Sequence, residues 1–125
     1  MSHFTTIQTE IRDVEALRLA CAELGIEVLE HAQARGYGGN GLSGDYVLRL
    51  KGPYDIAVQR QPEGPYRLST DWWEGHVERE VGANYGRLLQ LYAVHKATLE
   101  ARKRGVAVQR SRQKNGAIKL TLLAP

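Results

Sequence analysis

Apolar side chains recur at helical spacing in two stretches of the chain. Across residues 14–24 they stand three or four positions apart, which predicts one amphipathic helix. Asp13 is a good N-cap for this helix, and Gly25 supplies the left-handed residue that commonly ends one. A longer helix is predicted between residues 85 and 104, with one side formed by Tyr85, Leu88, Leu89, Tyr92, His95, Lys96 and Leu99.

Other stretches alternate apolar and polar residues with a period of two, which is typical of strands with one buried face. Two of the connections between them carry proline and glycine at hairpin spacing, so neighbouring strands should run antiparallel. Asn115-Gly116 is the strongest hairpin signal. The predicted strands are residues 3–11, 26–29, 46–51, 55–59, 66–69, 106–111 and 117–122.

The resulting order is β-α-β-β-β-β-α-β-β. We therefore predict an α+β fold, with a single mostly antiparallel sheet and two amphipathic helices packed on one of its faces. The length of 125 residues fits one domain spanning residues 1–125. No apolar run approaches the roughly 20 residues that span a bilayer, and the N-terminus lacks a signal-peptide pattern, so we expect a cytoplasmic protein.

Residues 35–44 contain five glycines and are predicted to form a mobile surface loop. Such a loop can cradle a phosphate, but this one lacks Gly-Lys-Ser/Thr and no helix follows it. We therefore expect no nucleotide and no other cofactor. Cys21, the only cysteine, rules out an internal disulfide and is expected to be a buried apolar side chain.

Asp71-Trp72-Trp73 is the most informative short segment. Neighbouring strand residues point to opposite faces, so Trp72 should follow Tyr66 and Leu68 into the core. Trp73 should then lie on the polar face or at its edge, where an exposed tryptophan often anchors a binding surface. The alternative is that the segment after it bends back and covers Trp73.

Charge is unevenly spread along the chain. Residues 96–119 hold eight basic residues against one acid, Glu100, so this segment carries +7 and the rest carries −4. Such asymmetry can attract a polyanion or an acidic partner, although a solvated helix end and hairpin would look the same. Strand alternation also predicts a basic open sheet face, formed by Arg49, Lys51, Gln59, Arg67, Ser69 and Lys119.

Asp71, with His76 and the acidic residues near it, could supply an acid–base pair or metal ligands. The other histidines are far away in sequence, and a metal site usually needs three or more converging ligands, so we predict no metal site. No Gly-x-Ser-x-Gly or His-Glu-x-x-His motif occurs. The sequence therefore leaves enzyme activity open but favours a protein that is not an enzyme.

Several short motifs together resemble a known family. In chain order they are Ser2-His3-Phe4-Thr5-Thr6-Ile7, Glu10-Ile11-Arg12-Asp13, Arg35-Gly36-Tyr37, Tyr54-Asp55-Ile56, Tyr66-x-Leu68-x-x-Asp71-Trp72-Trp73, Tyr92-Ala93-Val94-His95-Lys96, Arg104-Gly105 and Asn115-Gly116-x-Ile118-x-Leu120. Their order and spacing look like the small hypothetical chloroplast reading-frame family (ycf thirty-five), a bacterial and plastid domain of unknown function. The resemblance implies no activity, cofactor or catalytic residue, but it suggests an AAA-type ATPase as a protein partner.

From these observations we predict a non-enzymatic protein-interaction module or adaptor. Its expected binding residues are Tyr37, Arg49, Arg67, Asp71, Trp72, Trp73 and His76. One alternative is a nucleic-acid-binding protein that uses the basic sheet face. The other is a small-molecule or metal-dependent enzyme centred on Asp71 and His76. No membrane partner is expected.

Overall fold

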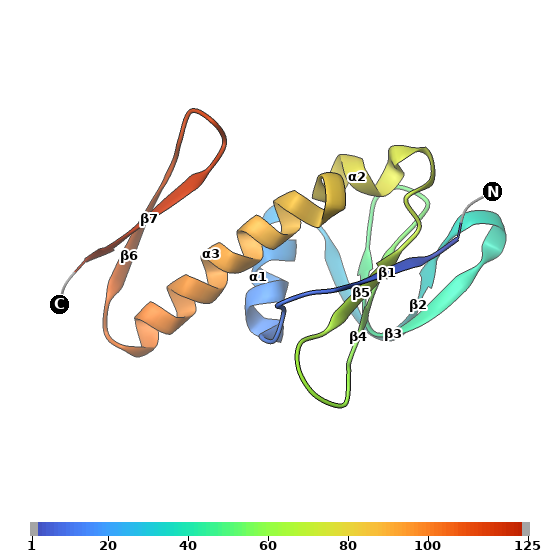
Figure 1. Ribbon diagram of the computed structural model, residues 1–125, viewed down its shortest axis with the longest axis horizontal. Helices are drawn as coiled ribbons and strands as arrows, with labels where there is room; N and C mark the ends of the chain where they lie inside the picture. Colours follow the sequence, from blue (N-terminus) through green and yellow to red (C-terminus); the bar gives the residue numbers. More distant parts are fainter. Residues whose placement is uncertain (1–2, 124–125) are drawn as a thin grey trace.

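The computed structural model describes residues 3–123 as an elongated α+β molecule (Figure 1). Short 3-10 turns lie at Tyr37–Gly39, Trp73–Gly75 and Ala83–Tyr85. No helix in this part of the chain is both long and apolar enough to cross a membrane. The helices and strands are β1 (Thr5–Gln8), α1 (Val14–Leu24), β2 (Glu27–Arg35), β3 (Gly41–Arg49), β4 (Ile56–Gln59), β5 (Arg67–Thr70), α2 (His76–Val81), α3 (Gly86–Lys103), β6 (Ala107–Arg112) and β7 (Ile118–Leu123).

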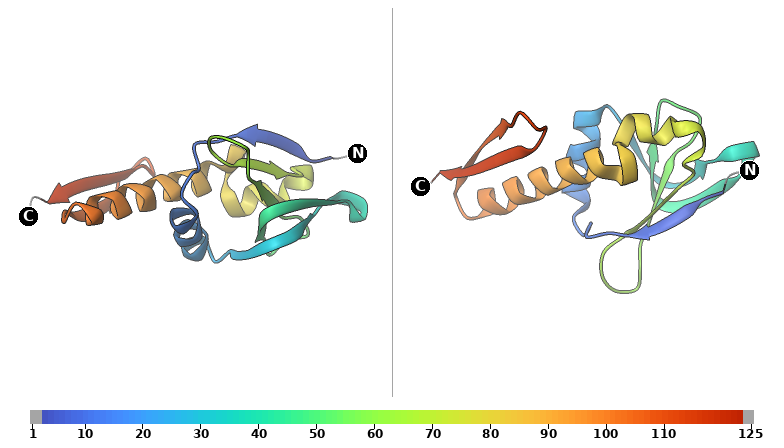
Figure 2. Two further views of the ribbon diagram at one scale, coloured as in Figure 1. Left: turned by 90° about the horizontal axis from the view of Figure 1, so that it is seen from below. Right: turned by 45° about the horizontal axis from the view of Figure 1, so that its top comes forward.

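The strands form two sheets. Five of them pair antiparallel in the order β1-β5-β4-β3-β2, which confirms the predicted fold class. The C-terminal strands were expected in the same sheet, but β6 and β7 pair only with each other. Figure 2 shows this hairpin beside α3, at the end of the molecule away from the larger sheet. Lys119 therefore does not lie on the larger sheet, contrary to the prediction.

Helix α1 begins and ends at the predicted residues. The Asp13 carboxylate accepts a hydrogen bond from the Ala16 amide at 3.2 Å, and Gly25 closes the helix with a φ of 72°. Cys21 is completely buried on this helix, as expected, and burial raises the pKa of its thiol to about 12. A protonated thiol in this position acts as a small apolar side chain.

The main core fills the space between one face of the five-stranded sheet and the helices α1 and α3. Leu17 and Leu88 enter it from the two helices, and Leu48, Ile56 and Leu68 enter it from the sheet. All five side chains are fully buried. The two long helices thus cover the same sheet face, as the amphipathic patterns predicted.

The second sheet face was expected to be open to water, and in its centre this is wrong. Val47, Ala57 and Ser69 point to this face, and all three are fully buried. Phe4 and Leu42 pack against the small cluster that Val47 and Ala57 belong to. Both sides of the sheet centre are therefore covered, because small side chains there let other segments approach closely.

The glycine-rich segment is also different from the prediction of a loop. Only the turn at Tyr37–Gly39 separates β2 from β3, and the ladder runs to the pair Arg35↔Gly41. Close packing explains one of the glycines: a Cβ atom at Gly44 would collide with the Tyr46 carbonyl oxygen and lie 3.2 Å from the Val58 amide nitrogen. The glycines of this segment therefore belong to a bent, closely packed hairpin.

Helix α2 was not predicted, because residues 74–82 show no clear hydrophobic period. The helix has only six residues and buries Val77 and Val81. Glu80 near its end accepts hydrogen bonds from the amides of Lys51 at 2.8 Å and Gly52 at 3.0 Å. α2 therefore anchors the turn between β3 and β4.

Candidate functional site

Trp72 is partly buried and Trp73 is exposed, the arrangement that alternation favoured, although β5 ends at Thr70 and Trp73 opens a 3-10 turn. The Trp72 ring packs edge-on against Tyr85, with ring centroids 4.8 Å apart, and joins the edge of the main core. Trp73 is 39% exposed. Of the two tryptophans, Trp73 is therefore the one that a partner could contact.

The chain around Trp73 is held in a defined turn. The Trp73 amide donates a hydrogen bond to Asp71 Oδ1 at 3.0 Å. Glu74 follows with a φ of 62° and Gly75 with a φ of 73°, so two successive residues are left-handed. A left-handed non-glycine residue costs free energy and persists only where its surroundings enforce it. The turn therefore presents the Trp73 ring in one orientation.

Tyr37 reaches the same place from the turn between β2 and β3. Its amide donates to Asp71 Oδ2 at 3.1 Å, across 34 positions of sequence. Its ring meets Trp73 edge-on, with centroids 6.0 Å apart and planes at 70°. Tyr37 is itself 41% exposed. We call the two exposed rings of Tyr37 and Trp73 the aromatic platform.

Asp71 connects the two halves of the aromatic platform. Its side chain is buried, with the residue only 1% exposed, and each of its oxygens accepts one backbone N–H. Hydrogen bonds to an ionised carboxylate are shorter and stronger than those between neutral groups. Asp71 therefore positions Tyr37 and Trp73 relative to each other.

His76 lies beside the aromatic platform and contacts Tyr54. The His76 and Tyr54 rings meet edge-on, with centroids 5.3 Å apart, and His76 Nδ1 is 3.3 Å from an Arg79 guanidinium nitrogen. Burial and then the negative charge of Asp71 raise the pKa of the Tyr54 hydroxyl. Tyr54 thus lies under the electrostatic influence of Asp71 and in ring contact with His76.

The described residues contain no group of three histidine, cysteine or acidic side chains that could hold a metal ion. One acid near His76, Glu80, has both oxygens engaged with the amides of Lys51 and Gly52.

Arg49, predicted to contact a partner from an open face, pairs with the buried Asp55 and keeps its side chain 35% exposed. Its Nε donates to Asp55 at 3.1 Å, and Arg35 donates to the same carboxylate at 2.8 and 2.7 Å. Burial raises the pKa of the fully buried Asp55, but hydrogen bonds from Arg35 and from the Leu50 amide outweigh it and keep the pKa below its ordinary value. Strand alternation alone could not predict this network, because Arg35 lies on β2 and Arg49 lies on β3.

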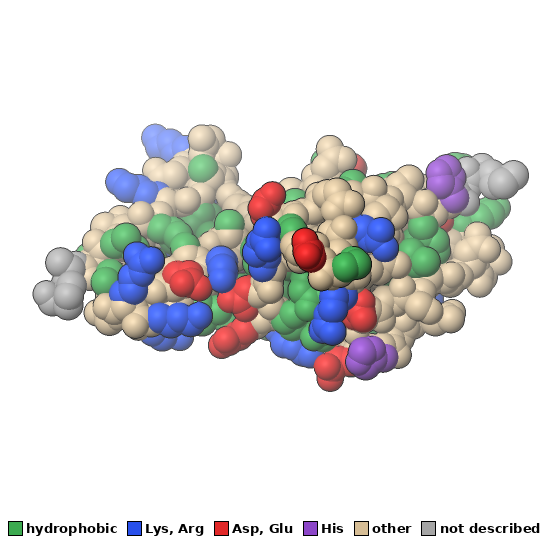
Figure 3. Space-filling view, turned by 60° about the horizontal axis from the view of Figure 1, so that its bottom comes forward, with side chains coloured by type: hydrophobic (Ala, Val, Ile, Leu, Met, Phe, Trp, Pro, Cys, Tyr) green, Lys and Arg blue, Asp and Glu red, His purple; other side chains and the backbone are tan. Residues whose placement is uncertain are grey.

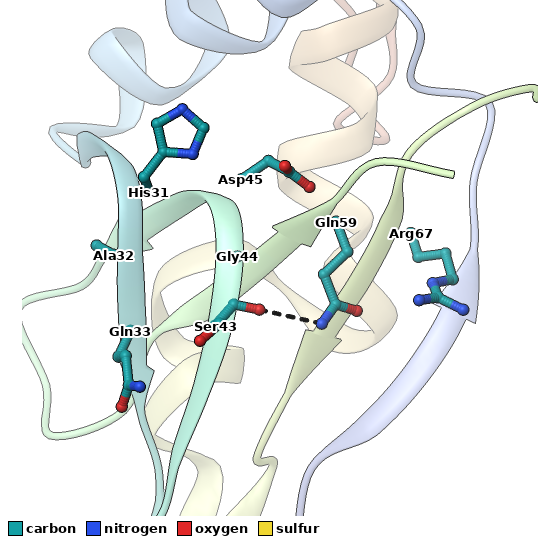
Figure 4. A pocket seen from close by; sticks show the side chains of 8 residues that line it. All are labelled: His31, Ala32, Gln33, Ser43, Gly44, Asp45, Gln59 and Arg67. Carbon is teal, nitrogen blue, oxygen red and sulfur yellow. Dashed lines mark hydrogen bonds between the residues drawn. The ribbon is translucent and has the colours of Figure 1, made fainter. Parts of the chain in front are cut away.

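Arg67 lies in a polar hollow on the second sheet face (Figure 4). The hollow has a volume of about 600 Å³, and its wall includes Gln59, whose side-chain amide donates to the Ser43 carbonyl at 3.1 Å. Arg67 Nε is buried without a hydrogen-bond partner among the described residues. His31, with a φ of 48°, marks the bend of β2 beside it.

The predicted basic sheet face is thus reduced to part of this hollow. Ser69 is buried, Arg49 is paired with Asp55, and Lys119 lies in the other sheet. Arg49, Gln59, Arg67 and Ser69 lie on the face where alternation placed them, but of these only Gln59 and Arg67 line the hollow. A broad basic face on the larger sheet does not form.

The fold and the site define a small α+β protein that presents two exposed aromatic rings on a buried carboxylate. The chain belongs to the family described as protein of unknown function DUF1257, whose family model matches residues 20–121. No curated protein and no solved structure matches the chain.

Proposed function

We propose that the protein is a non-enzymatic interaction module that docks a protein partner on the aromatic platform. The observation that carries this proposal is the joint exposure of Tyr37 and Trp73, held in edge contact by one buried carboxylate. Aromatic side chains supply large contact areas at low conformational cost, and tyrosine and tryptophan are enriched at binding hot spots. A site that is already ordered loses less entropy on binding.

The enzyme alternative centred on Asp71 and His76 has weaker support. A general base needs a carboxylate that can reach a substrate proton. Asp71 is 1% exposed and already accepts N–H groups from Tyr37 and Trp73. Its geometry suits a positioning role within the aromatic platform.

The first partner to test is an AAA-type ATPase. This suggestion rests only on the resemblance of the motifs to the chloroplast reading-frame family. Membership of that narrower group is likewise a proposal.

Binding to an immobilised AAA-type ATPase, compared among four forms of the protein, tests the proposal. Trp73→Ala and Tyr37→Ala should each weaken binding by about tenfold or more, because hot-spot aromatics cost about 2 kcal/mol or more when truncated. Leu19→Ala is a matched control, since Leu19 is 38% exposed on α1 and should change binding less than twofold. Unchanged binding by a folded Trp73→Ala variant would refute docking at the platform, and no binding by the wild type would exclude this partner.

A further inference from the structure

The last turn of α3 and the β6–β7 hairpin, residues 102–123, form what we call the basic arm. All of its cations are exposed, and two are paired: Arg110 with Glu23 and Lys103 with Glu100. The others make no ion pair with any described residue; they are Arg102, Arg104, Arg112, Lys114 and Lys119. Exposed cations without carboxylate partners can neutralise the charges of an anionic ligand.

The charge of the arm and its surroundings is large for so short a segment. Residues 96–119 carry +7 against −4 for the remainder of the chain. In Figure 3, lysine and arginine side chains gather over the end of the molecule that carries the C-terminus. A charge concentrated at one end creates a local positive field that a small net charge of +3 conceals.

The hairpin is a two-stranded ribbon with one solvent-facing side, which is polar except for the pair Ala107 and Leu123 at its base. On this side Gln109 pairs with Thr121 and Ser111 pairs with Lys119, and all four residues are exposed. The opposite side contacts the body: Ile118 packs against the main core there. The ribbon therefore presents hydrogen-bonding side chains outward, with Lys114 at its tip and Arg102 and Arg104 at its base, whereas Arg112 pairs with Ile118 on the side that faces the body.

We propose that the basic arm binds duplex DNA, with the polar side of the ribbon toward the major groove and the flanking cations on phosphates. The major groove of B-form DNA admits a two-stranded β-ribbon. Single-stranded nucleic acid needs aromatic rings for stacking, and residues 96–123 contain no phenylalanine, tyrosine or tryptophan. Duplex RNA is excluded because its deep, narrow major groove does not admit such an element.

This surface is separate from the aromatic platform. The turn at Tyr37–Gly39 and the β6–β7 hairpin lie at opposite ends of the molecule (Figure 1). Trp73→Ala should therefore leave DNA binding unchanged. The DNA-binding test of the basic arm can therefore succeed or fail independently of the partner-binding test of the aromatic platform.

Fluorescence anisotropy with a labelled DNA duplex of about 20 base pairs and the full chain tests the proposal. If the four unpaired cations outside the body-facing side, Arg102, Arg104, Lys114 and Lys119, contact phosphates, the affinity should fall roughly 150-fold between about 50 and 200 mM salt, from a slope of about 0.9 per contact. The double variant Lys114→Gln/Lys119→Gln should reduce that slope by about 1.8 and weaken binding by about tenfold or more. The control Lys51→Gln/Arg60→Gln makes the same net-charge change on the body, away from the arm, and should alter affinity less than about threefold.

Several results would overturn the proposal. Absence of duplex binding at the lower salt concentration would end it, and equal losses in the two double variants would show that net charge alone is responsible. Single-stranded DNA or duplex RNA bound as tightly as duplex DNA would contradict the groove argument. Equally tight binding of polyglutamate would assign the arm to an acidic protein instead.

Discussion

A single missing side chain lets the β2–β3 hairpin bend over the sheet. At Gly44 a Cβ atom would collide with the Tyr46 carbonyl oxygen and crowd the Val58 amide and the Ala57 side chain. Two of these neighbours are backbone atoms, which cannot rotate away as a flexible side chain can. Ala57 is itself fully buried. The bend therefore depends on glycine at this position.

Gly44→Ala should lower the free energy of unfolding by about 2 kcal/mol or more, since overpacking of this kind typically costs 1–3 kcal/mol. Gly86→Ala is the control: it opens α3 with an ordinary φ of −54° and has no neighbour within 4 Å. Alanine there should be neutral or stabilise the protein by up to about 1 kcal/mol. Urea unfolding measures both values, and equal midpoints for the two variants would contradict the packing argument.

Among the elements, the β6–β7 hairpin is the least firmly attached. Its strands pair with no other strand, and most of its residues are exposed. Among the described residues, its side-chain bonds to the body are the pair Arg110–Glu23 and a hydrogen bond from Gln90 to the Gly116 carbonyl. Exposed ion pairs contribute only about 0–1 kcal/mol, so the hairpin should open without global unfolding.

Hydrogen exchange on the native protein should reveal this difference. Amides of β6 and β7 should exchange at least about 100-fold faster than those of β4, because local opening costs less than global unfolding. The β4 residues Ile56–Val58 are fully buried on both sides of the sheet. Equal protection of the two regions would mean that the hairpin belongs to the cooperative core.

The sequence was most informative where local chemistry decides the structure. Asp13 and Gly25 marked the ends of α1 because capping acts within a few residues. Alternation left two positions open for Trp73, exposed or covered by the following segment, and the residue is exposed. The contact of Tyr37 with Trp73 could not be anticipated, because Asp71 joins them across 34 positions. Local rules carry no information about such long-range partners.

The same lack of information about long-range partners explains why parts of the sheet differ from the prediction. Alternation placed Arg49 on the second sheet face, but it could not show that Arg49 pairs there with the buried Asp55. The glycine-rich segment looks like a loop because glycine has low strand propensity. The close approach that requires Gly44 comes from the Tyr46 carbonyl within β3 and from the neighbouring strand β4. Ser69 was expected on an open face because strand alternation placed it there. It is buried instead, and its hydroxyl is hydrogen-bonded to the Thr6 hydroxyl at 2.7 Å.

At the scale of the whole molecule, stability should depend on the ionisation of acids whose pKa is lowered in the folded state. Asp55 is the most buried of them, and hydrogen bonds from Arg110 lower the pKa of Glu23. A lowered folded-state pKa means that the unfolded chain takes up protons first as the pH falls. The stabilisation is therefore complete above the unfolded-state pKa of about 4 and is lost as the pH falls through the folded-state value.

Asp55→Asn should lower the free energy of unfolding at pH 7 by about 3–5 kcal/mol, because Arg35 and Arg49 lose their shared charged partner. The variant should also lose less stability than the wild type between about pH 5 and pH 2, since one of the titrating acids is gone. Urea unfolding at several pH values measures both effects. An unchanged pH dependence in the variant would contradict the role assigned to Asp55.

The fold thus separates an aromatic platform at one end from a basic arm at the other. Two independent surfaces on one small body suit a protein that connects partners. The central claim is that the platform is the protein-docking surface, because the exposed rings and their buried carboxylate are what the proposed function rests on.

Photo-crosslinking in cells that produce the protein tests this claim most directly. A benzophenone amino acid in place of Tyr37 should give one discrete adduct with a partner protein, and the same group in place of Leu19 should give none. Adding Trp73→Ala should abolish the adduct at position 37. A folded protein that forms no adduct at position 37, or forms the same adduct from position 19, would contradict the account.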